Sequence, residues 1–498
     1  MIKTIYLKLT EPIYGLPISL FRLLVGLILA KFFSVYLIDT IYDRIFYNEV
    51  FPFTFNYPGL DFIIRLNGDG MTLFYLLTIL ICLLFAIGYR YKVTSILLFI
   101  LYTYHFLTTA NHYNNHYYLT LIFLFFFTII NGATHLAVDN IRKHTTHQPF
   151  IPFWQKLLFH IQLLIVFSYA TYWKIINPEW VEGILLKNVY TLLFNKWKHT
   201  HLISEHLYNL LTSYKVVLSQ LLSMSAIMLD MLVIPFLMWK KTRVVGILLM
   251  ILFNLINHQT LAIGYFPFFL IATLMLFINE NKLQQLYEKI ISKLNIKPIH
   301  QRSIPKFNIN KWPLVILTIF FIFQLILPLR HYILNTNTYN FINYAWRTEN
   351  FYFSWTMMST SNFCYKSQFY YQAHPHSVKI PVFLYLSDLT DYYQHNPQKA
   401  KIEYENIKNK HMHLHKLFDL PYLVKSKLSV PLYNQKIAIL IEQQLKKDYI
   451  TNPIITVKNI CGINMHNPQP KIKSSTILNK ETYHIFKSNH WILDLKKN

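Results

Sequence analysis

The chain has 498 residues, of which 53% are hydrophobic, 17% are aromatic and only 14% are charged. A soluble domain usually carries about 25% charged residues, so this composition excludes an ordinary soluble protein and indicates lipid-facing surface. The formal net charge of +24 would suit a nucleic-acid-binding protein. Much of the positive charge, however, lies in short runs beside apolar blocks, where the positive-inside rule and anionic headgroups place lysine and arginine. We therefore expect membrane lipid as a partner and no nucleic acid.

Apolar blocks fill the chain up to about Leu334, and the sequence beyond is of mixed composition. A helix needs about 20 apolar residues to cross the hydrocarbon core of a bilayer. The sequence therefore predicts about nine spans, near residues 18–38, 71–88, 93–110, 117–134, 156–173, 221–239, 244–258, 262–278 and 313–334. The seventh and eighth are short and separated only by Gln259 to Leu261, so this pair is alternatively one broken or re-entrant element. The predicted fold class is a polytopic α-helical membrane bundle over residues 1–334 with a small α+β domain over residues 335–498.

The charges of the loops predict the orientation of the bundle. Loops at 89–92, 135–155, 239–243 and 279–312 are rich in lysine and arginine, whereas those at 39–70 and 111–116 are nearly free of them. Positive loops stay on the cytoplasmic side, which places the N-terminus inside. An odd number of spans then places the C-terminal domain outside the cytoplasm. We expect a multi-pass protein of a bacterial inner membrane or a plasma membrane.

The C-terminal domain carries weaker signals. Residues 379–386 and 453–457 read as strands, and residues 396–417 and 434–448 read as helices. Cys364 and Cys461 both fall in this domain and are able to pair if it faces an oxidising compartment. The three cysteines have no zinc-site spacing, so no metal is predicted.

Four polar clusters interrupt the apolar blocks, and polar groups at these depths are costly in lipid. They are Asn111 to His116 before the fourth span, Lys174 at the end of the fifth, Asn254 with Asn257, His258 and Gln259 in the seventh, and Gln324 with Arg330 in the ninth. In the predicted topology all four lie at the outer ends of their spans, which suggests one cavity opening outward. Each also has a simpler interpretation, because His116 can cap a helix, Lys174 can reach the headgroups, and residues 257–259 can form a loop.

The same clusters resemble motifs of the vitamin K-dependent gamma-carboxylase family, also called the HTTM (horizontally transferred transmembrane) family. The resemblance covers most of the chain in matching order. It rests on Phe21-Arg22 with Gly26, Gly88 to Tyr91, Asn114 to Leu119, Ile165 to Lys174, Trp180 to Gly183, Asn257 to Pro267, Gln324 to Pro328 and Phe353 to Met358.

This resemblance implies a membrane enzyme that oxidises reduced vitamin K, of the menaquinol type, with O2 and uses the reaction to carboxylate glutamate in a peptide at the outer face. Lys174 matches the catalytic base of the family, and a lysine is a base only where its uncharged amine is favoured by burial or by nearby cations. His116 matches the histidine that orients the quinone oxygen. Residues expected at the cofactor site are Asn115, Asn254, Asn257, His258, Gln259 and Trp355.

The sequence also departs from the family pattern. Counted forward from Gln162, Lys174 occupies the position of the family lysine, but counted backward from Trp180 that position is Ile175. A second family histidine is replaced by Asn254, which cannot carry a proton, and the soluble domain is shorter than in carboxylases that bind a propeptide. Two alternatives therefore stay open: a family member without carboxylation that acts in peptide maturation, export or immunity, and a membrane protein that binds a partner without retained chemistry.

Overall fold

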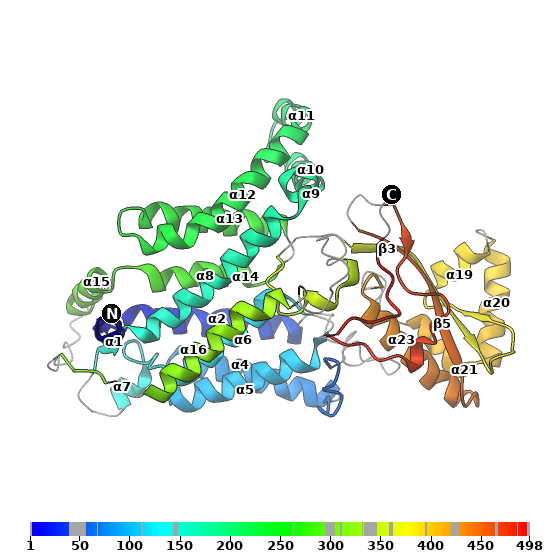
Figure 1. Ribbon diagram of the computed structural model, residues 1–498, viewed down its shortest axis with the longest axis horizontal. Helices are drawn as coiled ribbons and strands as arrows, with labels where there is room; N and C mark the ends of the chain where they lie inside the picture. Colours follow the sequence, from blue (N-terminus) through cyan, green and yellow to red (C-terminus); the bar gives the residue numbers. More distant parts are fainter. Residues whose placement is uncertain are drawn as a thin grey trace.

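The protein is described here from a computed structural model. The described residues are 2–38, 56–66, 68–110, 113–142, 148–261, 263–293, 304–308, 311–330, 332, 346–357, 362–393, 396–419, 428–463, 467–485 and 487–495. A bundle of long helices occupies one end of the molecule, and a smaller domain built on a β-sheet occupies the other (Figure 1). A helical part and a C-terminal part with a small sheet are therefore both present, while the expected boundary at residues 334 and 335 lies outside the described residues.

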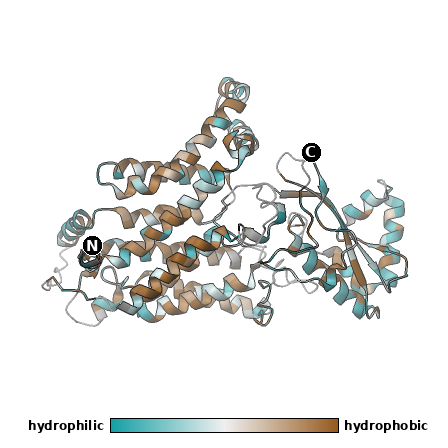
Figure 2. Cartoon of the chain, viewed as in Figure 1, coloured by the Kyte–Doolittle hydropathy of each residue, from teal (hydrophilic) through white to brown (hydrophobic). Residues whose placement is uncertain are grey.

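The bundle is formed mainly by apolar helices. Its helices are α1 (Ile2–Leu9), α2 (Leu16–Ile38), α4 (Gly68–Ala86), α5 (Tyr91–Thr108), α6 (Asn115–Ile129), α7 (Val138–Arg142), α8 (Trp154–Ile175), α9 (Pro178–Val181), α10 (Ile184–His199), α11 (Glu205–Ser213), α12 (Lys215–Met238), α13 (Arg243–Thr260), α14 (Phe266–Thr273) with η2 (Leu274–Phe277), α15 (Glu280–Lys293) and α16 (Lys311–Ile326) with η3 (Leu327–Leu329). A small antiparallel ribbon pairs β1 (Pro12–Tyr14) with β2 (Phe150–Pro152). The bundle helices consist largely of hydrophobic residues (Figure 2), and many of their large hydrophobic side chains are exposed, as lipid contact requires.

Each of the nine expected apolar segments coincides with a helix, but fewer of them can cross a membrane alone. Among the described residues, five helices are long and apolar enough: Leu16–Val35, Gly68–Ala86, Lys215–Met238, Arg243–Thr260 and Trp312–Leu329. A sixth candidate consists of Phe266–Phe277 and Glu280–Lys293, which are bent by 96° at their junction. α5 and α8 have 18 and 22 residues, and their polar side chains lower their mean hydropathy. The seventh and eighth segments are separate helices, because α13 ends at Thr260 and α14 begins at Phe266. The bend of 96° lies farther along the chain, after η2.

Arg22 is fully buried in α2 and does not extend to a membrane surface. Its guanidinium donates to the carbonyl oxygens of Gly132 and Ala86, at 2.9 and 3.1 Å. Gly88 lies beside it with φ +67°, and a Cβ at that position would stand 2.7 Å from Arg22 Nη1. This residue therefore has to be glycine both for its left-handed backbone and for the space that the guanidinium occupies.

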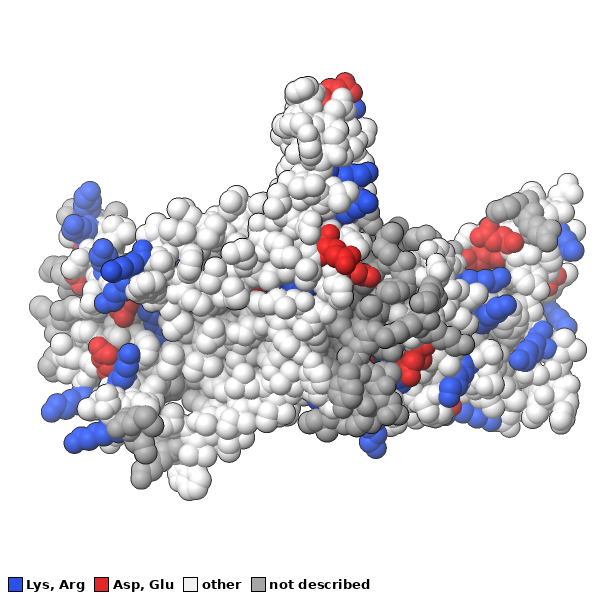
Figure 3. Space-filling model, turned by 45° about the horizontal axis from the view of Figure 1, so that its top comes forward, with Lys and Arg blue, Asp and Glu red and all other residues white. Residues whose placement is uncertain are grey.

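Charged side chains separate into two ends. On the face drawn in Figure 3, lysine and arginine gather at the end of the bundle farthest from the C-terminal domain, on the projecting arm (α10, α11 and the start of α12) and on that domain, and the part of the bundle between the far end and the arm is nearly uncharged. In Figure 1, α1, α15 and the turn between α12 and α13 lie at that far end. The basic loops therefore share one end, as the predicted topology requires.

The C-terminal domain contains a four-stranded antiparallel sheet of order β4-β3-β5-β6. Its elements are β3 (Asn362–Gln372), β4 (Ile380–Val382), α19 (Leu386–Tyr392), α20 (Pro397–Lys410), α21 (Met412–His415), α23 (Pro431–Lys447), β5 (Ile454–Ile463), β6 (Gln469–Pro470) and η6 (Leu478–Lys480). The two expected helical segments are present, and β5 extends the expected strand. β3, the longest strand, was not predicted, and the expected strand at 379–386 is shortened because a helix begins at Leu386.

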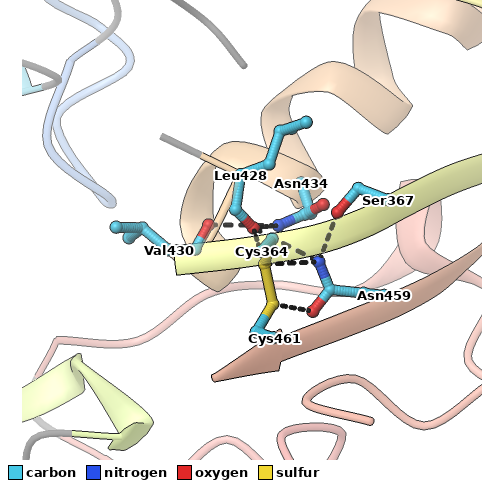
Figure 4. Close-up of a disulfide and its surroundings, with 7 residues drawn as sticks. All are labelled: Cys364, Ser367, Leu428, Val430, Asn434, Asn459 and Cys461. Atoms are coloured by element: carbon cyan, nitrogen blue, oxygen red, sulfur yellow. Dashed lines mark hydrogen bonds between the residues drawn. A yellow bond between two sulfur atoms is a disulfide. The ribbon is translucent and has the colours of Figure 1, made fainter. Parts of the chain in front are cut away.

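Cys364 and Cys461 lie opposite each other on β3 and β5 and form a disulfide (Figure 4). The Asn459 amide supports the junction by donating to Ser367 Oγ at 2.6 Å and to the Leu428 carbonyl at 3.2 Å. The pairing left open at the sequence level is thus present, and it closes a loop of 97 residues.

Loss of this disulfide is expected to destabilise the domain. A cross-link over about 100 residues removes loop-closure entropy of the unfolded chain equivalent to about 4–5 kcal/mol. The double variant Cys364→Ser, Cys461→Ser should therefore unfold at a lower denaturant concentration than the wild type under non-reducing conditions. Reductant should lower the wild-type midpoint to that of the variant, and an unchanged midpoint would contradict the cross-link.

Lys471 gives the domain a specific pH dependence. Burial lowers the pKa of Lys471 to about 7 against the attraction of Glu349, and its ammonium lies 4.5 Å from the Trp346 ring centroid. Between pH 7 and about 10.5 the unfolded chain then binds more protons at this group than the folded chain, so stability rises with pH across this window. Lys471→Met should remove that rise in thermal unfolding measurements, whereas Lys458→Met, at an exposed position of β5, should retain it.

Candidate functional site

A cavity of about 170 Å³ lies between two groups of bundle helices, at the end nearest the C-terminal domain. α6, α8 and α14 provide one wall, and α10, α12 and α13 provide the other. Its lining is Asn114, Asn115, His116, Val166, Phe167, Ala170, Lys174, Trp180, Leu186, Val189, Tyr190, Ala226, Asp230, Phe253, Asn257, Thr260, Leu261, Ile263, Phe266, Leu270, Phe351, Thr356 and Met357. A concave, mostly apolar site with a few converging polar groups is typical of small-molecule binding.

Lys174 contributes the cation of this cavity. It lies in the last turn of α8, and its Nζ donates to Asp230 Oδ2 of α12 at 2.5 Å. The two side chains are 7% and 4% exposed, so the ion pair is almost completely removed from solvent. In an apolar bundle each charge would be costly alone, and together they join α8 to α12 at the cavity wall.

The local sequence after α8 turns the chain back over Lys174. Asn177 caps α9 by accepting a hydrogen bond from the Glu179 amide at 3.1 Å, and Pro178 occupies the first helical position. This turn places the Trp180 ring 4.7 Å from Lys174 Nζ. The aromatic face adds a cation–π contact and excludes water from the ammonium.

His116 is brought to the same cavity from the first turn of α6. Its ring stacks on Phe266 of α14, with 5.0 Å between the ring centroids. We find no hydrogen bond from this ring to another of the described residues, so its nitrogens are available to a ligand. An imidazole held by an aromatic ring, within one cavity with an amine, can orient an oxygen of a bound aromatic molecule.

A short segment near the start of the C-terminal domain, residues 351–357, contributes Phe351, Thr356 and Met357 to the cavity lining. The Ser354 carbonyl accepts a hydrogen bond from Trp173 Nε1 at 2.7 Å, and the Thr356 carbonyl accepts one from the Asn115 amide at 3.0 Å. Phe353 and Trp355 have left-handed backbones, with φ of 59° and 58°. Such conformations cost about 1–3 kcal/mol each for bulky residues and occur mainly at functional sites, so the surrounding hydrogen bonds hold this segment under strain.

The structure divides the predicted cofactor-site residues into two groups. Asn115 and Asn257 line the cavity. Trp355 does not line it and instead stacks on Tyr118, with ring centroids 5.0 Å apart, while its neighbours Thr356 and Met357 face the cavity.

The remaining three predicted residues are not part of the lining. Asn254 is buried and donates to the Met250 carbonyl of its own helix at 2.8 Å. His258 and Gln259 are exposed, and the His258 ring packs against Phe268. The cause is that α13 stays helical to Thr260, so residues 258 and 259 leave the face that carries Asn257.

The register of α8 resolves the choice between Lys174 and Ile175. The helix runs without interruption from Trp154 to Ile175, and Lys174 faces the cavity. Ile175 is 52% exposed on another side of the helix. Counting along the helix from Gln162 therefore gives the residue in the site, and the turn before α9 accommodates the extra residue.

Asp230 is the site residue that sequence reasoning missed. It is the single acidic residue in the 24 residues of α12. A lone carboxylate in an otherwise apolar span is itself a signal of function or of a buried partner, and it would have predicted a cation such as Lys174 opposite it.

Two protein-family models match the chain. Residues 11–281 match the HTTM domain, and residues 309–498 match the lumenal domain of vitamin K-dependent gamma-carboxylase. The chain belongs to the HTTM family. The comparison with solved structures found no match. As an HTTM protein with a gamma-carboxylase lumenal domain, the chain is a membrane protein whose C-terminal part lies on the extracytoplasmic side.

The match to the lumenal domain of vitamin K-dependent gamma-carboxylase implies dependence on vitamin K, and the residues present fit this group. An apolar cavity suits a naphthoquinone ring, and the polar residues gathered in its lining suit the oxygens of the ring. No group of three or more potential metal ligands occurs among the described residues.

The buried ion pair has a measurable signature in this HTTM protein. Removing one partner leaves an uncompensated buried charge and typically costs about 3–5 kcal/mol. Asp230→Asn and Lys174→Met should each lower the unfolding temperature in detergent, whereas the double variant Lys174→Met, Asp230→Leu should recover most of the loss. Additive losses in the double variant would show that the two side chains do not interact.

Proposed function

We propose that this HTTM protein is a quinol-dependent membrane enzyme that uses Lys174 as its base and His116 as its orienting group. The observation that supports this most directly is that both side chains, from different helices, line one apolar cavity. The site lies at the end of the bundle that faces the lumenal domain, where a peptide can approach.

Reduced vitamin K, when bound, supplies the driving chemistry: its oxidation by O2 to the epoxide gives the base strength needed to remove a γ-proton from glutamate, and the carbanion then takes up CO2. His116 holds a ring oxygen, and Phe266 fixes the imidazole plane. The apolar lining and the strained segment around Thr356 keep water away from the reacting atoms. The expected products are an epoxide and a carboxylated glutamate.

Lys174 must present an uncharged amine to act as a base. Its partner makes this feasible, because transfer of the shared proton from Nζ to the Asp230 carboxylate leaves two neutral groups and no net charge in the cavity. Asp230 is then the residue that stores the proton, and Trp180 limits exchange with water.

The orientation also forms part of the proposal. The N-terminus lies on the cytoplasmic side of a bacterial inner or plasma membrane, because the lysine-rich and arginine-rich loops gather at the end of the bundle opposite the C-terminal domain. The substrate is a peptide or protein outside the cytoplasm.

The ion pair itself favours a second candidate function. A lysine held as an ammonium by a carboxylate has a structural role, and the protein would then bind a partner, or act in peptide maturation, export or immunity, without carboxylation. Asn254 also supports this alternative. It replaces the second family histidine, cannot carry a proton and lies outside the cavity lining.

Turnover separates the two candidates. Purified protein supplied with reduced vitamin K, O2, labelled bicarbonate and a glutamate peptide should form the epoxide and fix the label. Lys174→Ala should lower epoxide formation by about 10²–10⁴-fold, the usual contribution of a general base, while Lys458→Ala should leave it unchanged. Wild-type protein that forms no epoxide would refute the enzymatic proposal.

A further inference from the structure

An arm made of α10, α11 and the start of α12 extends sideways from the bundle. In Figure 1, α11 lies farthest from the other helices, and α10 joins the bundle at the end nearest the C-terminal domain. None of the residues of α11 is buried. The arm therefore lies at the depth where the apolar band of the bundle ends.

The surface of the arm is more apolar than a surface in water should be. α11 carries Leu207, Leu210 and Leu211, and Tyr214 at its C-cap continues their i, i+3, i+4, i+7 spacing. Leu207 and Leu210 are 39% and 47% exposed. An exposed apolar stripe of this kind marks an interaction surface.

This stripe continues directly into the lipid-facing surface of the bundle. Tyr214 joins α11 to α12, where Val216, Val217 and Leu221 are all more than half exposed. α12 is one of the helices long and apolar enough to cross the membrane. Because these exposed apolar residues of the span begin directly after α11, lipid that covers the span reaches the arm.

The charges of the arm complete the pattern of an interfacial helix. Residues 184–215 contain four lysines (Lys187, Lys196, Lys198 and Lys215) and one glutamate, which gives a formal charge of +3. Glu205 already pairs with Lys198 at 2.8 Å, while Lys196 is exposed. Amphipathic helices with lysine on the polar face lie in the headgroup layer and bind anionic lipid.

We propose that this arm lies in the headgroup layer at the extracytoplasmic end of the bundle, with its leucine stripe in the acyl boundary and anionic phospholipid headgroups on its lysines. α10 also provides Leu186, Val189 and Tyr190 to the cavity wall. The lipid surface thus holds one wall of the cavity in place. Under the proposed function, which this last step assumes, the arm sets how a lipid-dissolved quinol reaches Lys174.

Spin labels in liposomes test the location of the arm without reference to activity. In a Cys82→Ala background, labels at Leu207→Cys and Leu210→Cys should collide more often with oxygen than with a water-soluble nickel chelate. Leu80→Cys, on the exposed face of α4, provides the lipid reference. Tyr449→Cys, at a C-terminal-domain residue that is 94% exposed, provides the aqueous reference. Labels on α11 that give the values of the Tyr449 position would overturn the proposal.

A second measurement tests the headgroup contact. Native mass spectrometry with phosphatidylglycerol or phosphatidylcholine should show tighter binding of the anionic lipid. The variant Lys196→Gln, Lys215→Gln should weaken it by about fivefold per lysine. The matched variant Lys458→Gln should bind as the wild type does. Equal binding of the two lipids, or equal loss in the matched variant, would refute the headgroup contact and favour an acidic peptide as the partner.

These measurements separate the arm from the enzyme. If the labels lie in lipid but no epoxide forms, the arm proposal stands and the enzymatic proposal fails. If both hold, Leu207→Asp with Leu210→Asp should raise the KM for the quinol with little change in kcat, because these residues lie outside the cavity lining.

Discussion

The arrangement of the site depends on one constraint: two opposite charges inside an apolar bundle must form an ion pair. Lys174 and Asp230 are 56 residues apart in the sequence, and their helices belong to different walls of the cavity. Their contact fixes the position of α12 against α8, and α13 follows because it packs on α12. The cavity lies between the two walls that this ion pair connects. The pair therefore shapes the site as well as supplying its chemistry.

The second constraint is set by a segment near the cavity that lies far along the sequence from the helices it contacts. The segment from Phe353 to Met357 is distant in sequence from α6 and α8, yet its carbonyl groups accept hydrogen bonds from Trp173 and Asn115. These bonds offset the cost of two left-handed aromatic residues. The bonds satisfy two donors at the helix ends, the Trp173 indole N–H and the Asn115 amide, and losing either bond would leave a buried donor unpaired.

The positions of the helices and several of the cavity residues were predictable from the sequence, and the misassignments have physical reasons. Apolar block length located the helices, and the convergence of Asn115, His116, Lys174 and Asn257 followed from their common depth. His258 and Gln259 could not be assigned from spacing, because their direction depends on whether α13 ends before or after them. β3 was missed because its side chains pack in a sheet whose pairing is not local. Asp230 was missed because the partner of a buried charge is found from a sequence only when lone charges in different apolar segments are compared with one another.

Trp173 and Lys174 are neighbours in α8, so their side chains leave the helix about 100° apart. Lys174 faces the cavity, while Trp173 packs with Trp346 and Ile463 beneath the disulfide strand. The end of α8 therefore contacts the soluble domain through Trp173 and the cavity through Lys174. Because both side chains belong to one helix, a displacement of the domain that moves Trp173 also rotates Lys174.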